Sequence, residues 1–325
     1  MTSPDALRER FEQYVRDHPV GLSPQTLYDP ASYIMSLGGK RMRPVLLLLA
    51  YGMWHEPVDE ALPAALAIEV FHNFTLVHDD MMDAAQMRRG KPTVHQKYGT
   101  NSAILSGDVM LIRSFDLLLQ SCHRDNVIEV METMTEVSMR ICEGQQLDLD
   151  FESRDKVTQE EYLEMITLKT AVLLGAAMKI GALLAGAPAE EADHLYNAGL
   201  YLGKAFQIQD DVLDAYGDEA VTGKRRGGDI VNAKKTILYT SLLGALSPAR
   251  AQTFIELYKE RAANPEVKIQ QVLRWFEDHD MRANSEALCM SLYREGLARI
   301  DAAQGSVVGR TVLSDYVGHL LDRKL

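Results

Sequence analysis

The run HNFTLVHDDMMD, residues 72–83, ends an apolar segment in three aspartates. In a helix, Asp79 and Asp83 are four residues apart and therefore share one face. Two carboxylates on one face repel each other unless a cation lies between them, and hard oxygen ligands favour Mg²⁺. A second run, FQIQDDVLD at residues 206–214, repeats the arrangement.

The two DDxxD boxes are more informative together than either is alone. A single acidic cluster is usually a solvated helix face. Here the residues before each box are apolar, and carboxylates at the end of a buried stripe are costly unless they bind metal or pair with cations. We therefore interpret the pair as a functional site. The candidate metal ligands are Asp79, Asp80, Asp83, Asp210, Asp211 and Asp214.

The composition indicates a helical protein that is acidic overall. The chain has 325 residues, and 46% of them are apolar, which is ample for a core. The formal net charge of −12, from 34 Lys and Arg against 46 Asp and Glu, argues against a general nucleic-acid binder. The three cysteines lack CxxC spacing, so we expect neither a disulfide framework nor a zinc site.

The N-terminal sequence shows neither the basic segment nor the apolar core of a signal peptide. The apolar run at residues 45–51 is far too short to span a bilayer. We expect a cytoplasmic protein without an integral membrane segment.

Helical periodicity extends along most of the chain, and no alternating strand pattern interrupts it. Residues 87–93 and 217–232 are expected to be loops. The prediction is an all-α fold, a single large bundle of roughly ten or more helices within one domain over residues 1–325. The expected helices span residues 4–18, a segment ending at 37, 45–53 opened by Pro44, 63 to the first box, 103–122, 126–150, 158–186, 188–216, 233–246, 249–263, 266–279, 284–303 and 308–323.

One face of the first acidic helix carries a polar line. His72, Thr75, Asp79 and Asp83 are spaced three, four and four residues apart, so they lie on the same side. A polar line in an otherwise apolar helix indicates a cavity. In a helix considered alone, a satisfied core histidine above a capped helix end would explain the same pattern.

Three further segments place polar or charged residues beside apolar ones. The sequence GGKRMRP, residues 38–44, puts cations before the N-terminus of a buried helix, which is a natural anion site. Lys169 and Thr170 interrupt an apolar helix, and GQQLDL at residues 144–149 ends another with polar groups. Taken singly, a basic helix entrance and a snorkelling lysine are the plainer explanations.

Taken together, these segments resemble the trans-isoprenyl diphosphate synthase family, also called polyprenyl synthetases. The match covers nearly the whole chain, in family order. It comprises GGKxxRP at 38–44, His72, the first DDxxD with Arg88-Arg89-Gly90, GQxxDL at 144–149, Lys169-Thr170, FQxxDDxxD at 206–214, Gly223-Lys224 and Lys234-x-Thr236. The resemblance implies helices around a central cavity and, usually, a homodimer.

The resemblance also implies a reaction, the condensation of isopentenyl diphosphate with an allylic diphosphate by ionisation, condensation and elimination. Three Mg²⁺ ions would be held by Asp79, Asp83 and Asp210, with Asp80, Asp211 and Asp214 supporting. The allylic phosphates would contact Arg88, Lys169, Lys224 and Lys234. Isopentenyl diphosphate would bind Lys40, Arg43, His72 and Arg89.

The residue types suit this chemistry. Breaking the allylic C–O bond leaves pyrophosphate and a carbocation, so the site must stabilise negative charge at one end. Thr170 and Gln207 offer oxygen dipoles without a strong nucleophile, so they can stabilise the cation without trapping it. The departing pyrophosphate can remove the final proton, which makes a histidine or glutamate base unnecessary.

Product length is expected to depend on the residues below the first box. Phe74 is five residues before Asp79, about 7–8 Å along a helix, while Thr75 lies more directly beneath the aspartates and Phe71 one turn deeper. In the family, an aromatic residue at the Phe74 position limits chain growth. We predict a short-chain product, geranylgeranyl (C20) diphosphate ahead of farnesyl (C15) diphosphate. Simple core packing of Phe74 is the alternative.

Other classes of protein match less of the chain. Glu69-x-x-His72 and Glu191-x-x-His194 are the pairs of di-iron helix bundles, but that fold leaves both boxes and the basic loops unexplained. A terpene cyclase usually lacks the second box and the GGKxxR segment. A non-catalytic synthase subunit typically loses one box.

Two details of the resemblance are left open by the sequence. Ala233-Lys234-Lys235 stands where family members often have Gly-Lys, so either Lys234 or Lys235 is the phosphate ligand. The terminal residues 323–325 resemble a basic tail that closes over isopentenyl diphosphate in some members.

Overall fold

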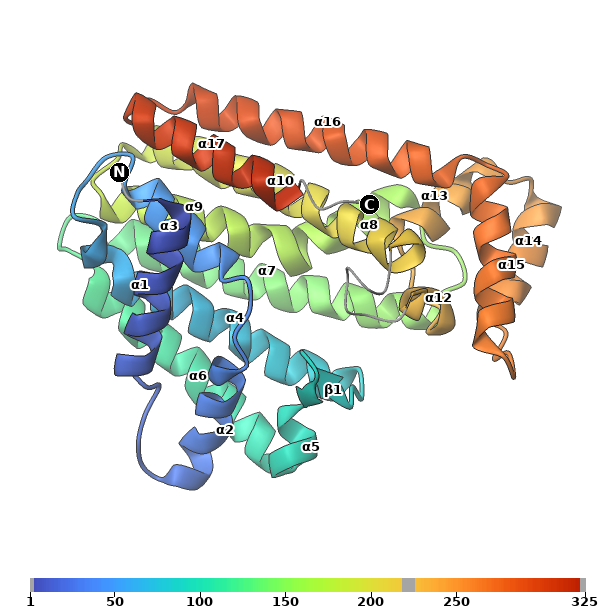
Figure 1. The fold of residues 1–325 in the computed structure, drawn as a ribbon, viewed down its shortest axis with the longest axis horizontal. Helices are drawn as coiled ribbons and strands as arrows, with labels where there is room; N and C mark the ends of the chain where they lie inside the picture. Colours follow the sequence, from blue (N-terminus) through green and yellow to red (C-terminus); the bar gives the residue numbers. More distant parts are fainter. Residues whose placement is uncertain (1–2, 218–225, 322–325) are drawn as a thin grey trace. The chain divides into compact units, whose positions relative to one another are not determined.

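The computed structural model describes residues 3–217 and 226–321, and these are almost entirely helical (Figure 1). The all-α prediction is confirmed. Lys224 and residues 323–325, which carried predictions, lie outside the described residues. The chain divides into two compact units, so the single domain over residues 1–325 stays a prediction.

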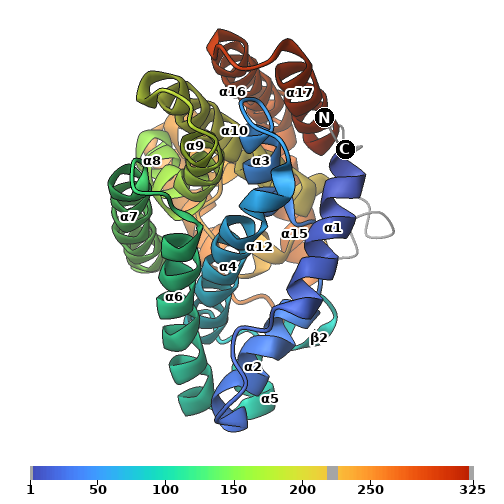
Figure 2. The ribbon, with the colours of Figure 1, turned by 90° about the vertical axis from the view of Figure 1, so that its left-hand side faces the viewer.

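The first unit comprises Met1–Thr135, Ala176–Tyr196 and Ala303–Ser314. Its complete helices are α1 (Pro4–Asp17), α2 (Gln25–Ser36), α3 (Met42–Tyr51), η1 (Val58–Ala61), α4 (Leu62–Met82), α5 (Val94–Tyr98) and α6 (Thr100–Ser121). Helix α4 is its centre, packing along α6 on one side and α3 on another (Figures 1 and 2).

The second unit comprises Glu136–Gly175, Asn197–Ala302 and Asp315–Leu325. Its complete elements are α8 (Gln159–Ile166), η2 (Thr167–Ala171), α12 (Gly228–Val231), α13 (Ile237–Ala245), α14 (Pro248–Lys259), α15 (Pro265–Glu277) and α16 (Met281–Ala302). Four of the five boundaries between the units fall inside helices, and the fifth follows the end of α16. The four divided helices are α7 (Val127–Ser153), α9 (Val172–Leu184), α10 (Ala189–Tyr216) and α17 (Val307–Leu321).

Helix α3 confirms the prediction of a helix buried on nearly every side, because Arg43 is its only residue that is not fully buried. The expected start was wrong by three residues. The helix begins at Met42, after Arg41 in the left-handed region at φ 48. Pro44 therefore lies within the first turn, where a missing N–H costs no intrahelical hydrogen bond.

The expected loop at residues 87–93 contains a small hairpin. Strands β1 (Met87–Arg88) and β2 (Lys91–Pro92) pair antiparallel, and the two residues between them have φ values of 51 at Arg89 and 74 at Gly90. Positive φ at both central residues is typical of a type I′ turn, whose twist suits a hairpin. Strands of two residues are too short to produce an alternating pattern, so the sequence did not indicate them.

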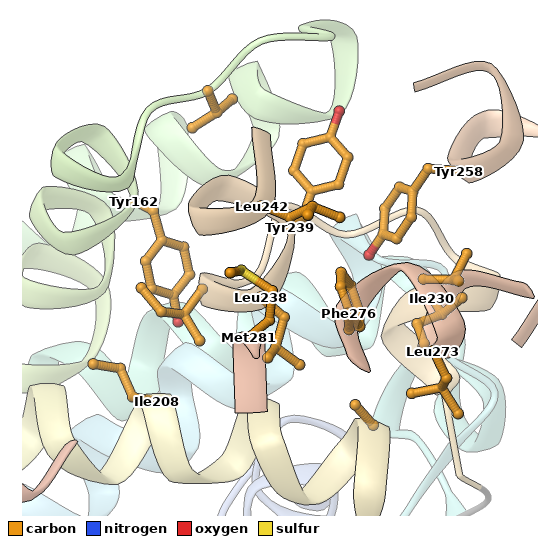
Figure 3. Packing of buried hydrophobic residues seen from close by; sticks show 14 of the residues in the cluster. Tyr162, Ile208, Ile230, Leu238, Tyr239, Leu242, Tyr258, Leu273, Phe276 and Met281 are labelled. Atoms are coloured by element: carbon orange, nitrogen blue, oxygen red, sulfur yellow. The ribbon is translucent and has the colours of Figure 1, made fainter. Parts of the chain in front are cut away.

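The core of the second unit is an aromatic-rich cluster. Figure 3 shows the rings of Tyr239, Tyr258 and Phe276 gathered on one side of the cluster and Tyr162 near Ile208 on the other. The ring centroids of Tyr239 and Tyr258 are 4.5 Å apart. This packing fixes α8 and α13 against α10, the helix that carries the second acidic box.

Helix α8 begins with the predicted capping box, in which Thr158 and Glu161 bond each other's backbone N–H groups. The helix continues through η2, a π-helical turn, into α9. By length and composition alone, the stretch Gln159–Leu184 could cross a membrane, but 72% of its most apolar window is buried inside the protein. Buried core helices share this composition, so the stretch is weak evidence for a membrane span.

The helix expected over residues 233–246 begins late, at Ile237. Ala233 has φ 53, and the Thr236 hydroxyl accepts a hydrogen bond from the N–H of Tyr239 as the N-cap. Residues 233–236 therefore form a loop that leads into the helix. The loop expected over 217–232 also contains the short helix α12 among its described residues.

Candidate active site

The first acidic box lies at the C-terminal end of α4. Asp79 and Asp80 are in the last turn, and Asp83 is the C-cap residue. The negative end of the helix dipole disfavours carboxylates at this position. Three aspartates there require nearby positive charge.

Arg88 supplies part of that charge and holds the middle aspartate. Asp80 is 1% exposed, and its two oxygens accept hydrogen bonds from Nε and Nη2 of Arg88 at 2.8 and 2.7 Å. Burial lowers the pKa of the guanidinium, but Asp80, Asp79 and Asp83 together raise it above its ordinary value. The hairpin thus fixes Asp80 inside the protein, while Asp79 is partly exposed and Asp83 exposed.

Near the first box, the structure brings together three of the four predicted isopentenyl diphosphate ligands. Arg43 Nη1 lies 3.2 Å from His72 Nε2. Burial, Arg43 and Arg89 lower the pKa of His72 well below its ordinary value. A guanidinium can only donate, so His72 is neutral, accepts at Nε2 and carries its proton on Nδ1.

Arg89 lies against the glycine segment that precedes α3. Its Nη1 donates to the carbonyl of Gly38, and a Cβ at Gly39 would lie 2.9 Å from its Cζ. Gly39 also has φ 140, so both its backbone and its surroundings require glycine. Lys40, the fourth predicted ligand, is exposed on this segment.

The second acidic box lies near the C-terminal end of α10. Asp211, its middle aspartate, is 5% exposed. It accepts hydrogen bonds from Tyr162 Oη at 2.5 Å, the Ile237 N–H at 3.0 Å and Gln207 Nε2 at 3.1 Å. Burial raises the pKa of Asp211 to about 6, against the lowering effect of these hydrogen bonds. Asp211 therefore joins α10 to α8 and to the start of α13.

The other two aspartates of the second box are half-buried. Asp214 Oδ2 accepts the N–H of Asp229 at 3.0 Å, at the first turn of α12. Gln207 directs its amide nitrogen to Asp211, which leaves the amide oxygen pointing elsewhere. That orientation suits the predicted role of Gln207 as an oxygen dipole.

Lys169 and Thr170 lie in the π-helical turn η2, a feature frequently found at functional sites. Two glycines let neighbouring helices approach this turn. A Cβ at Gly144 of α7 would lie 2.3 Å from the Lys169 nitrogen, and one at Gly203 of α10 would lie 2.5 Å from the Ala171 Cα. The GQxxDL and Lys-Thr segments are therefore in direct contact.

Four charged residues meet beside this turn, two of them predicted site lysines. Lys169 Nζ is 2.7 Å from Asp148 Oδ2, and Lys234 Nζ is 2.9 Å from Glu152 and 4.0 Å from Asp148. Lys235 points away from them, since it is 8% exposed and its Nζ lies 5.0 Å from the ring centroid of Tyr239. Of the two lysines, Lys234 is therefore the one that lies beside Lys169.

Below the first box, Phe74 is half-buried between two other rings. Its centroid is 5.4 Å from that of Phe71 and 5.0 Å from that of His78. The Thr75 hydroxyl donates to the carbonyl of His72 at 2.7 Å, so its polar group is satisfied within the helix. Phe71 is fully buried, which leaves Phe74 as the more accessible aromatic residue.

Among residues 3–217 and 226–321, no three His, Cys, Asp or Glu side chains are gathered closely enough to hold a metal ion by themselves. The two glutamates of the di-iron alternative are engaged elsewhere, Glu69 with Arg41 and Glu191 with the Gln304 N–H. For Mg²⁺ the donor set fits, because Mg²⁺ commonly takes one or two carboxylates and completes its shell with water and phosphate oxygens.

Comparison with known proteins identifies the family. The polyprenyl synthetase family profile matches residues 24–275. A geranylgeranyl diphosphate synthase of Methanosarcina mazei is 46% identical over 66% of this chain and 67% of its own. A geranylfarnesyl diphosphate synthase of Natronomonas pharaonis is 36% identical over 99% of both chains. A solved geranylgeranyl pyrophosphate synthase superposes over all of both chains with a TM-score of 0.93 and 39% identity.

The chain belongs to the polyprenyl synthetase family. It is therefore a trans-prenyltransferase, an isoprenyl diphosphate synthase, as the motifs predicted. Sequence reasoning about this polyprenyl synthetase missed Tyr162 and Asp148 as partners of Asp211 and Lys169. For Asp148 a signal existed, since the GQxxDL segment was already noted. Tyr162 lies two helical turns before Lys169, and nothing in the sequence marked it.

Proposed function

We propose that this polyprenyl synthetase condenses isopentenyl diphosphate head-to-tail with allylic diphosphates, in a Mg²⁺-dependent reaction that yields geranylgeranyl diphosphate. The main support is a feature shared by both acidic boxes. In each, the middle aspartate is buried and held by the protein, while the first and last lie nearer the surface at the end of a helix.

The outer carboxylates are suited to metal binding. We assign Asp79, Asp83 and Asp210 as the Mg²⁺ ligands, with Asp214 supporting. Asp80 and Asp211 have their oxygens occupied by protein donors, so we assign them to holding the boxes in place. Bound Mg²⁺ would offset negative charge on the leaving diphosphate.

The remaining charged residues divide into two groups. Lys169 and Lys234, with Arg88, would contact the allylic phosphates, and Thr170 and Gln207 would face the carbocation. Arg43 keeps its charge at neutral pH, because burial lowers its pKa only to about 10. Its Nε is buried and makes no hydrogen bond to the described residues. With Lys40, His72 and Arg89 it would bind the second diphosphate, for which a terpene cyclase has no use.

The reaction is tested by assaying the purified protein with dimethylallyl and isopentenyl diphosphates. We expect prenyl transfer that a chelator abolishes and added Mg²⁺ restores. A metal-independent reaction would contradict the assignment, and so would absence of transfer, which is expected of a non-catalytic subunit.

The relatives are named for both geranylgeranyl and geranylfarnesyl products, so product length needs its own argument. Phe74 is the half-buried aromatic residue one turn above Phe71, and the next residue in the sequence toward the aspartates is the small Thr75. A single aromatic ring at this position suggests that the growing chain stops deeper below the first box than it would with two adjacent aromatic rings. We assign a C20 product, with farnesyl diphosphate as the alternative.

Substituting Phe74→Ala tests this assignment. If Phe74 limits growth, its removal lengthens the product by one or more C5 units, as seen by chromatography of the dephosphorylated products. If Phe74 only packs in the core, the variant is destabilised by about 3–5 kcal/mol and product length stays unchanged.

We also propose a homodimer formed through α6. Ile104, Leu105, Ile112 and Leu119 are exposed on this helix, by 42%, 59%, 68% and 52%. Leu105, Ile112 and Leu119 are seven residues apart and Ile104 is eight residues before Ile112, so all four lie on one side of the helix. Exposed apolar side chains gathered on one side favour association. Light scattering is the test. A monomer at working concentration would contradict the proposal.

A further inference from the structure

Arg41 lies between two predicted substrate ligands, Lys40 and Arg43, yet its side chain is buried. It is 3% exposed. Its Nε donates to Glu12 at 2.8 Å, its Nη1 to Glu69 at 2.6 Å and its Nη2 to the Met35 carbonyl at 2.7 Å. Each of the three nitrogens donates to the protein and the side chain is buried, so Arg41 is not placed to contact a substrate.

Glu69 is the buried counter-charge of this segment. It is 3% exposed and lies on α4 one turn before His72. Asn73 Nδ2 donates to its Oε1 at 3.2 Å and to its carbonyl at 2.8 Å. Glu69 also favours the charged forms of Arg43 and Arg89. One carboxylate thus offsets the mutual repulsion of several guanidinium groups.

The backbone at Arg41 requires an explanation of its own. Its φ of 48 follows φ values of 72 at Gly38 and 140 at Gly39. Glycine adopts such values readily, but an arginine in this region is uncommon. The three side-chain hydrogen bonds of Arg41 can hold it there. They connect the segment to α1, to α2 and to α4.

We propose that Arg41 and Glu69 are positioning residues for isopentenyl diphosphate. Their buried pair fixes the conformation of residues 38–43 and so sets the placement of Lys40 and Arg43, without touching the substrate. Arg89 secures the same segment through the Gly38 carbonyl. This inference rests on the proposed function, because it assumes that these cations bind the second diphosphate.

Substitutions that keep either the charge or the shape of the side chain test the positioning role without leaving a cavity. Arg41→Lys keeps the charge, but one ammonium replaces a planar fork that reaches three acceptors. Glu69→Gln keeps the shape and removes the charge. Combining Glu69→Gln with Asn73→Asp returns a carboxylate to a position whose side chain lies 3.2 Å from Glu69 Oε1. Arg10→Lys on α1 is the matched control, since its pair with Asp59 is exposed.

We expect Arg41→Lys and Glu69→Gln to raise the KM for isopentenyl diphosphate about tenfold and to leave the KM for the allylic substrate within twofold. The double variant should recover at least half of that loss on a logarithmic scale, and Arg10→Lys should match the unmodified protein. The affinity for isopentenyl diphosphate, measured by calorimetry without turnover, should rank the variants in the same order.

The result that overturns the inference is unchanged binding of isopentenyl diphosphate in Arg41→Lys and Glu69→Gln. An equal rise in both KM values, with a lowered melting temperature and no recovery in the double variant, also overturns it, because that pattern indicates a merely structural role. If the unmodified protein binds isopentenyl diphosphate, and Arg41→Lys binds it more weakly, but no transfer occurs, the proposed function fails while the positioning role stands.

Discussion

The two acidic boxes share a sequence pattern but are held in different ways. In the first, Asp80 is paired with the charged Arg88 of a hairpin. In the second, Asp211 is bonded by neutral donors, the Tyr162 hydroxyl, the Ile237 N–H and the Gln207 amide. The first arrangement depends on charge and the second on helix packing. The same five-residue pattern can therefore leave its outer carboxylates nearer the surface whether its middle aspartate is held by an ion pair or by neutral hydrogen-bond donors.

The comparison predicts that the first aspartate matters equally in both boxes. Asp79→Ala and Asp210→Ala each remove a proposed Mg²⁺ ligand, so turnover should fall by about 10²-fold or more. Circular dichroism should show both variants folded. Asp125→Ala, an exposed residue outside both boxes, is the control. Near-unmodified turnover in either box variant would show that the boxes are not equivalent.

For the middle aspartates, in contrast, removing the partner should cost different amounts of stability in the two boxes. Arg88→Ala leaves a buried carboxylate without its counter-ion, which should cost about 3–5 kcal/mol. Tyr162→Phe removes one of three hydrogen bonds to Asp211 and should cost about 1–3 kcal/mol. Urea unfolding measures both. A cost for Tyr162→Phe equal to that of Arg88→Ala would remove the distinction between the two supports.

The sequence could predict the outer residues of each box but not the role of the middle ones. Spacing places Asp79 and Asp83 on one face, and the same holds for Asp210 and Asp214. Spacing cannot show that the intervening aspartate is buried, because burial depends on segments far away in the chain. Asp211 is bonded by a tyrosine 49 residues earlier and a backbone N–H 26 residues later.

The conformations of the loops could not be predicted from the sequence either. Their shape here depends on single backbone angles, at Arg41, Arg89 and Ala233, and not on periodicity. Helix periodicity predicted α1, α4 and α10 well because each repeats its apolar pattern over several turns. The segments that carry Lys40, Arg88 and Lys234 have no such repeat.

The cation cluster near the first box predicts a pH dependence of stability. The pKa of His72 lies well below its ordinary value of 6.5. Below pH 6.5 the unfolded chain therefore binds a proton that the folded protein does not. Stability should be full above pH 6.5 and fall as the pH decreases, by up to about 1.4 kcal/mol per pH unit from this group.

His72→Asn removes that titration. Denaturant unfolding at pH values between 5 and 7 should show a shallower loss of stability in the variant, whatever its absolute stability. Equal slopes in His72→Asn and the unmodified protein would mean that His72 is protonated in the folded state.

The smallest expected effect concerns the loop beside the second box. Ala233 has φ 53, in the left-handed region, which is disfavoured for a residue with a Cβ by roughly 1–2 kcal/mol. Glycine adopts this angle without strain but loses more conformational entropy on folding, by roughly 0.5–1 kcal/mol. Ala233→Gly should therefore stabilise the protein by about 0.5–1 kcal/mol in urea unfolding, with the Lys234 contact to Glu152 intact. Asp280→Gly is the control, because Asp280 has φ 56 but aspartate tolerates this region better than alanine, so its gain should be smaller. A loss of stability in Ala233→Gly would mean that the alanine methyl contributes more packing than the backbone strain costs.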